Sequence, residues 1–87
     1  MKTKNTYKKL IGSRILKIRM ELGMTQAEFA QAAGIGQQHT ISGYERGHMR
    51  PNLSSVTRIL LLTQKHNKRY TFDYLYPELK RKGVSNG

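Results

Sequence analysis

The chain has 87 residues, which suits one domain and is too short for two. It carries 16 Lys and Arg residues against 5 Asp and Glu, and the resulting formal net charge of +11 favours a polyanionic partner. No cysteine is present, which excludes disulfides and thiolate metal sites.

Targeting and membrane signals are missing from the sequence. The N-terminus is basic, but no apolar segment follows it, so no signal peptide is expected. The longest uninterrupted apolar run spans residues 59–62, far less than a membrane span requires. We therefore expect a soluble, cytoplasmic protein that has no membrane partner.

The first predicted helix runs from about residue 6 to residue 22. The preceding residues 1–5 are polar and basic, and we expect them to form a loosely attached arm. Apolar residues then recur at helical spacing, at Ile11, Ile15, Ile18 and Leu22. This spacing predicts a single apolar stripe, and Gly23 is expected to end the helix.

Two short helices follow. Thr25 is predicted to cap the first of them, and Glu28, three residues later, completes a capping box. This second helix buries Phe29, Ala30 and Ala33 and ends at Gly34. The third helix starts at Gln37 or Gln38, runs to Arg46 and buries Ile41 and Tyr44 before Gly47 closes it.

The last part of the chain predicts two more helices. Asn52 caps a fourth helix after Pro51, and Thr71 caps a short fifth helix that Pro77 disturbs. No alternation of polar and apolar residues predicts a strand. The expected fold is all-α, with five helices in one domain over residues 1–87. Its core covers about 6–76, between the basic arm 1–5 and a frayed tail at 77–87.

Several segments resemble the phage-repressor and Cro-like helix-turn-helix family (the xenobiotic-response-element type). They are IGSRI at 11–15, GMTQAEFA at 23–30, TIS at 40–42 and YERG at 44–47. The likeness runs from about residue 11 to residue 76 and includes Pro51 and the segment 71–75. It implies a lambda-repressor-like five-helix domain that binds double-stranded DNA, with the helix-turn-helix at helices two and three and no cofactor.

The resemblance implies that the third helix reads bases in the major groove. Its base-reading positions are Gln37, Gln38, His39, Ser42 and Gly43. A glutamine amide can bond adenine N6 and N7 together, and His39 is either a base contact or an ordinary exposed residue. Gly43 has no side chain, so a position that commonly reads a base is silent.

Phosphate contacts are implied around this helix. Gln26 matches the residue that contacts a phosphate at the start of helix two, where free N–H groups favour anions. The other phosphate candidates are Arg14, Lys17, Thr25, Thr40, Arg46, His48 and Arg50, together with the lysines of residues 2–9. Arg19 and Glu45 match a partly buried ion pair that holds the third helix.

Relative to this family, the sequence adds one residue before the third helix, within the segment Gly34-Ile35-Gly36-Gln37-Gln38. Counting from Gly34 makes Gln37 the first recognition residue, whereas counting back from Tyr44 selects Gln38. An insertion within the helix would turn its reading face by about 100°. We expect an extended turn in which Gly36 absorbs the added residue.

A sequence-specific transcriptional regulator, most simply a repressor, is the expected function. Such modules bind as two-fold dimers, and the expected dimer surface is near helix five, at Phe72, Tyr74, Leu75, Tyr76 and Leu79. The alternatives are an antitoxin that binds a toxin and represses its own operon, and an adaptor of the transcription machinery. An enzyme is not expected, because three histidines and five scattered acids form no catalytic or metal-binding pattern.

Overall fold

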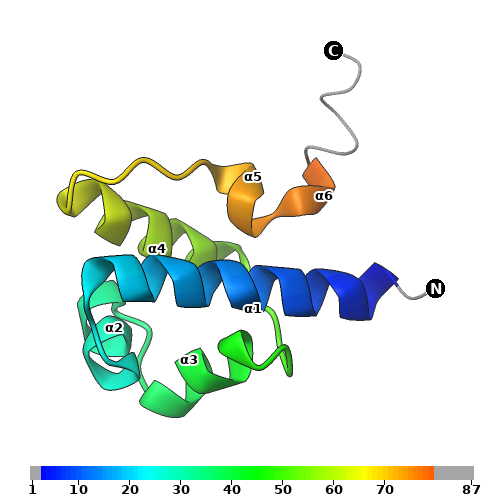
Figure 1. The fold of residues 1–87 in the computed structure, drawn as a ribbon, viewed down its shortest axis with the longest axis horizontal. Helices are drawn as coiled ribbons and strands as arrows, with labels where there is room; N and C mark the ends of the chain where they lie inside the picture. The colour runs from blue at the N-terminus through cyan, green and yellow to red at the C-terminus, as the bar shows by residue number, and fades with distance from the viewer. Residues whose placement is uncertain (1–2, 80–87) are drawn as a thin grey trace.

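The computed structural model describes residues 3–79, and over this range the chain forms helices and no strand (Figure 1). The helices are α1 (Thr3–Leu22), α2 (Gln26–Ala33), α3 (Gln38–Glu45), α4 (Leu53–Lys65), α5 (Phe72–Leu75) and α6 (Pro77–Leu79). The all-α prediction is confirmed. The five expected helices are present, and α6 is one further turn after α5.

The ends of the domain differ from the sequence prediction. Helix α1 begins at Thr3, about three residues before the predicted start, so residues 3–5 of the predicted arm are helical. The physical reason is that neither proline nor glycine interrupts the chain before Gly12. At the other end, α6 occupies the first residues of the predicted frayed tail, and residues 80–87 lie outside the described range.

Local capping signals fix the starts of α2 and α4. Thr25 Oγ1 accepts a hydrogen bond from Glu28 N at 3.1 Å, and Glu28 Oε1 accepts one from Thr25 N at 2.9 Å, which completes the predicted capping box. Asn52 Oδ1 accepts from Ser55 N at 2.9 Å. Helix α2 ends at Gly34, whose φ of 71° is the left-handed conformation that glycine adopts easily.

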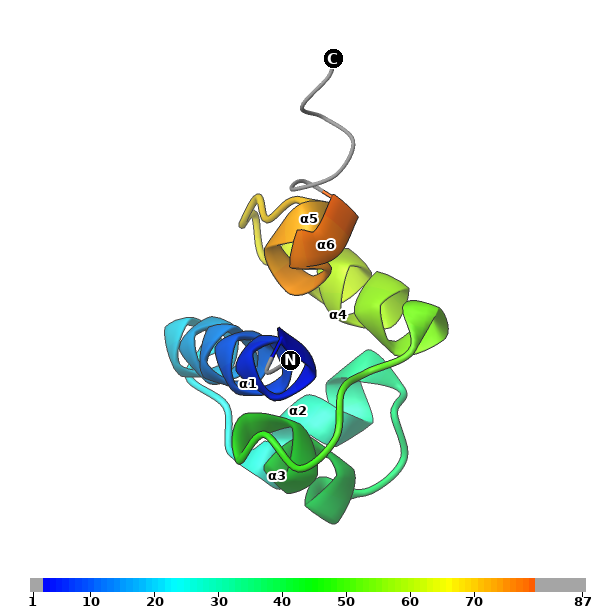
Figure 2. The same cartoon turned by 90° about the vertical axis from the view of Figure 1, so that its right-hand side faces the viewer.

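Helix α1 lies between two groups of helices. Helix α3 packs on one side of it and α5 on the other side, while α2 packs against α3 and α4, and α4 also contacts α5 (Figure 1, Figure 2). The predicted stripe of α1 supplies Ile11, Ile15 and Ile18 to the core, and these side chains are fully buried. The remaining core residues are Phe29, Ala30, Ala33, Ile41, Tyr44, Val56, Ile59, Leu62 and Leu75.

A glycine allows α1 and α3 to touch. A Cβ atom built on Gly12 would lie 2.2 Å from the carbonyl oxygen of Tyr44 and 3.0 Å from that of Glu45. Both obstacles are backbone atoms, so a side chain at this position would force the two helices apart. The absence of a side chain on Gly12 therefore sets how closely α3 is held against the central helix.

Aromatic residues join α5 to the rest of the domain. The rings of Tyr70 and Tyr74 lie 5.0 Å apart between centroids, and those of Phe72 and Tyr76 lie 5.6 Å apart. The Tyr70 hydroxyl donates to the Glu21 carboxylate of α1. Burial and this hydrogen bond together raise the pKa of Tyr70 to about 12.

Candidate nucleic-acid interface

The turn between α2 and α3 spans residues 34–37. Gln37 is the N-cap of α3, and the helix runs without interruption from Gln38 to Glu45. Gly36 has a φ of 105°, which a residue with a side chain rarely adopts. Gly36 and Gln37 therefore both lie in this turn, where we expected the added residue, and the register of α3 follows from the burial of Ile41 and Tyr44.

This register gives α3 a polar outward face. Gln38, His39 and Arg46 are exposed and Ser42 is partly exposed. Positions 38, 42 and 46 follow one another at intervals of four residues and so share one side of the helix. Gln37 is also exposed, but it belongs to the turn that leads into the helix. Thr40 is partly exposed.

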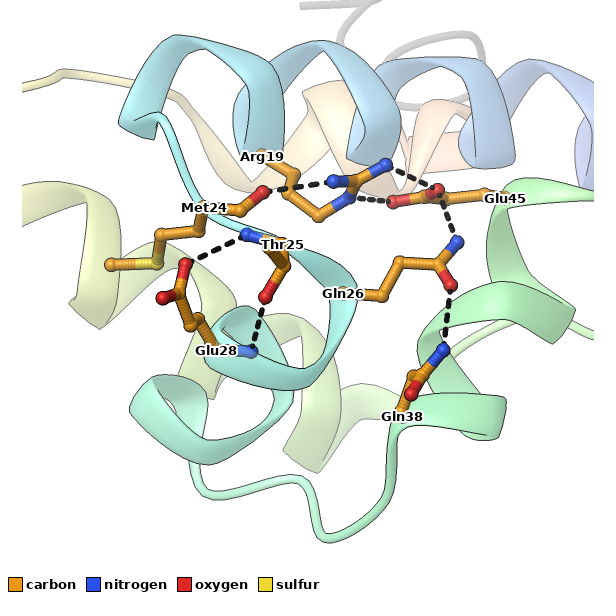
Figure 3. A network of polar contacts seen from close by, with 7 residues as sticks. All are labelled: Arg19, Met24, Thr25, Gln26, Glu28, Gln38 and Glu45. Carbon is orange, nitrogen blue, oxygen red and sulfur yellow. Dashed lines mark hydrogen bonds and ion pairs between the residues drawn. The ribbon is translucent and has the colours of Figure 1, made fainter.

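Gln26 at the start of α2 bridges the two ends of α3 (Figure 3). Its Nε2 atom donates to Glu45 Oε1 at 2.9 Å, and its Oε1 atom accepts from Gln38 Nε2 at 3.3 Å. Because a carboxylate only accepts hydrogen bonds, Gln26 must turn its amide nitrogen toward Glu45. Its oxygen then faces Gln38, the first residue of the outward face, and the hydrogen bond limits the rotation of the Gln38 side chain.

The predicted pair of Arg19 and Glu45 is formed and anchors this network. Arg19 Nε lies 2.6 Å from Glu45 Oε2, and Arg19 Nη2 lies 3.0 Å from Glu45 Oε1. Arg19 Nη1 also donates to the carbonyl oxygen of Met24 at 2.8 Å. Helix α1, the segment before α2 and the end of α3 are thus held together by one guanidinium (Figure 3).

Groups that favour anions lie at both ends of α3. The first turn of α2 contains the backbone N–H groups of Gln26 and Ala27, for which a helix provides no internal acceptor. At the other end, Arg46 and His48 are exposed. Lys9 of α1 joins them, since a Cβ on Gly47 would lie 3.0 Å from Lys9 Cγ.

Three other phosphate candidates, Arg14, Lys17 and Arg50, contact residues outside α3. Arg14 Nη1 donates to the carbonyl oxygen of Tyr74 in α5 at 2.7 Å. Helices α5 and α3 lie on opposite sides of α1 (Figure 2). Lys17 Nζ lies 3.9 Å from Glu21 Oε2 on the exposed surface of α1. The structure therefore does not group Arg14 with the residues around α3.

Arg50 pairs with the end of the domain. Its Nη1 and Nη2 atoms donate to the two carboxylate oxygens of Glu78 at 2.5 and 2.9 Å, and its guanidinium lies 4.9 Å from the centre of the Tyr76 ring. The hydrogen bonds raise the pKa of Arg50 and lower the pKa of Glu78, because they stabilise both charged forms. A phosphate would have to compete with Glu78 for this guanidinium.

The reasoning from sequence missed Met49. Gly43 follows His39 by four residues, so it stands on the outward side of α3, yet it is buried. A Cβ on Gly43 would lie 2.7 Å from Met49 Cε and 3.3 Å from Met49 Cγ. The available signal was a glycine at an outward helical position followed, six residues later, by an apolar side chain in a basic loop.

Residues 3–79 contain neither a membrane span nor a metal site. No helix between residues 3 and 79 is long and apolar enough to cross a membrane. Within the same residues, no group of His, Asp and Glu side chains is arranged to hold a metal ion.

Comparison with known proteins identifies the family. A family model described as helix-turn-helix matches residues 15–66, more than half of the chain, from the middle of α1 through α4. No curated protein and no solved structure matches the chain. The matched segment contains the capped α2, the extended turn and the polar face of α3 described above. The chain therefore belongs to the Cro/C1-type helix-turn-helix family.

Proposed function

We propose that this protein binds duplex DNA sequence-specifically, with α3 in the major groove, and acts as a transcriptional repressor. Its family is one of DNA-binding transcription regulators. The observation that carries the proposal is the outward face of α3, where Gln38, His39 and Ser42 offer hydrogen-bonding groups beside one another. An α-helix that presents such groups fits the width of the major groove.

Gln38 is the proposed principal base reader. One of its amide hydrogens is directed to Gln26, which leaves its other N–H and its oxygen for a partner. That remaining donor and acceptor suit the N7 and N6 groups of adenine. His39 and Ser42 extend the contact along the groove, and Gln37 reaches its edge from the turn.

Phosphate contacts are proposed to flank this reading face. At one end, Thr25 and the first turn of α2, with the Gln26 side chain, would receive a phosphate. At the other end, Arg46, His48 and Lys9 would lie along the sugar-phosphate backbone, with Thr40 between the two groups. Contacts of this kind position a helix in the groove and carry most of the affinity, but they specify no sequence.

Binding as a homodimer on two half-sites is part of the proposal. Of the residues expected to mediate it, Leu75 is buried in the core, and Phe72, Tyr74 and Tyr76 are partly buried within the chain. The remaining exposed parts of these rings are the proposed contact. The mass of the complex on a duplex with two half-sites tests this directly, and one protein chain per duplex at saturation would contradict it.

A binding titration tests the core of the function. We expect the protein to bind one duplex sequence at least about a thousandfold more tightly than a scrambled duplex of equal length at the same salt concentration, the lower end of the range typical of specific binders. The affinity should fall with salt, and Arg46→Ala should reduce the slope of that dependence by about one unit. Equal affinity for all duplexes would contradict sequence-specific binding.

A further inference from the structure

The outward face of α3 contains a gap that another residue fills. Gly43 follows His39 by one helical turn, and a side chain there would project from the same side of the helix. The space is occupied by Met49, whose Cε atom lies 2.7 Å and Sδ atom 3.7 Å from the position of the missing Cβ. The thioether thus stands where the side chain of residue 43 would otherwise be.

The backbone after α3 brings Met49 back onto the helix. His48 N donates to the carbonyl oxygen of Gly43 at 2.9 Å, and Gly47 N donates to that of Tyr44 at 3.0 Å. Gly47 makes this tight reversal with a φ of 77°. The chain is therefore folded against the last turn of α3, and the residue after His48 is directed over Gly43.

Met49 is not simply a core residue. Its side chain is 40% exposed, whereas the twelve hydrophobic core residues are each at most 6% exposed. The residues on either side of it in the chain, His48 and Arg50, are polar or basic. An apolar group that is left half in water, and that covers a glycine on the helix face, is placed to contact an apolar feature of a partner.

We propose that Met49 determines sequence preference by contacting the C5-methyl group of a thymine in the major groove, in place of a side chain at position 43. The inference rests on the proposed function and deepens it. The thymine methyl is the main apolar feature among the base edges in that groove. A thioether with three rotatable bonds has no strong donor or acceptor and adapts its shape to such a group.

Uracil substitution provides the test, because it removes only the methyl group. On the duplex that the wild-type protein prefers, each thymine is replaced in turn by deoxyuridine and the dissociation constant is measured. One replacement should weaken wild-type binding about fourfold, the ratio expected for losing one buried methyl group. Met49→Ala should bind the thymine and uracil duplexes equally.

Two further variants make the result specific. Gly43→Ala places a Cβ against the flexible end of Met49 and should displace it, so this variant should also lose the preference for thymine. Met20→Ala removes another exposed methionine, 64% exposed on α1, and should keep the wild-type preference. Unfolding curves for all variants verify that each is folded at the temperature of the binding measurement.

The outcomes separate this inference from the function on which it rests. A wild-type protein that prefers no duplex overturns both. A wild-type protein that prefers one duplex but tolerates uracil at every position overturns the role of Met49 alone. The same holds if Met49→Ala keeps the wild-type ratio between the thymine and uracil duplexes.

Discussion

Arg19 on α1 and Glu45 at the end of α3 form a bidentate ion pair, with N–O distances of 2.6 and 3.0 Å. Only 14% of the Arg19 side chain and 7% of the Glu45 side chain are exposed. The same carboxylate accepts a hydrogen bond from Gln26, which in turn accepts one from Gln38. The ion pair is thus connected, through Gln26, to Gln38, the first residue of the proposed reading face.

Removing one partner of this pair should be costly. Glu45→Ala leaves the Arg19 guanidinium largely buried without its carboxylate, and we expect a loss of about 3–5 kcal/mol in the free energy of unfolding. Urea denaturation monitored by circular dichroism measures it. The double variant Arg19→Met/Glu45→Leu should recover most of this loss, since it leaves no unpaired charge. An unchanged urea midpoint for Glu45→Ala would contradict the structural role of the pair.

Adding one methyl group at Gly12 should loosen the attachment of α3. The Cβ of Gly12→Ala would overlap the Tyr44 carbonyl oxygen at 2.2 Å, so the backbones of α1 and α3 must separate. We expect the free energy of unfolding to fall by about 1–3 kcal/mol or more, the loss that is typical of overpacking. The matched control is Ser13→Ala on the exposed side of α1, which should change it by less than about 0.5 kcal/mol. Equal melting temperatures for the two variants would rule out the close contact.

The pair of Arg50 and Glu78 should make stability depend on pH in the acidic range. Because the hydrogen bond from Arg50 lowers the pKa of Glu78 below its ordinary value of 4.5, the folded chain binds this proton less readily than the unfolded chain. The stabilisation is therefore complete above about pH 4.5 and is lost as the pH falls through the lower, folded-state pKa. For a partly exposed pair it is about 1 kcal/mol or less.

Comparing wild type with Glu78→Gln isolates this contribution. The difference in unfolding free energy should be present at pH 7 and shrink as the pH falls below 4.5. A difference that is identical at pH 7 and pH 3 would show that Glu78 does not act through its charge.

The local parts of the fold could be predicted from the sequence because their causes are local. Thr25 and Glu28 lie three residues apart and together cap the start of α2. Gly36 has the backbone freedom that an extended turn needs. The register of α3 followed from two apolar residues, Ile41 and Tyr44. In contrast, Arg19 and Glu45 are 26 residues apart, and only the resemblance to a family indicated that they pair.

The surroundings of single surface residues could not be predicted. Arg14 contacts Tyr74, which is 60 residues away, and Arg50 contacts Glu78, which is 28 residues away. Spacing along the chain does not decide whether an arginine is solvated or paired across the domain. Likewise, the position of Met49 over Gly43 depends on how the loop after α3 reverses, which involves contacts between backbone groups rather than a side-chain pattern.

Selection of bound duplexes from a random pool tests the central claim most directly, namely that α3 reads bases from Gln38 onward. Wild type should enrich one sequence, and Gln38→Ala should lose the preference at a single adenine while keeping it elsewhere. Gln37→Ala is the matched control, since Gln37 lies in the turn, and it should retain that adenine. Enrichment of no sequence by wild type, or loss of the adenine with Gln37→Ala but not with Gln38→Ala, would contradict the claim.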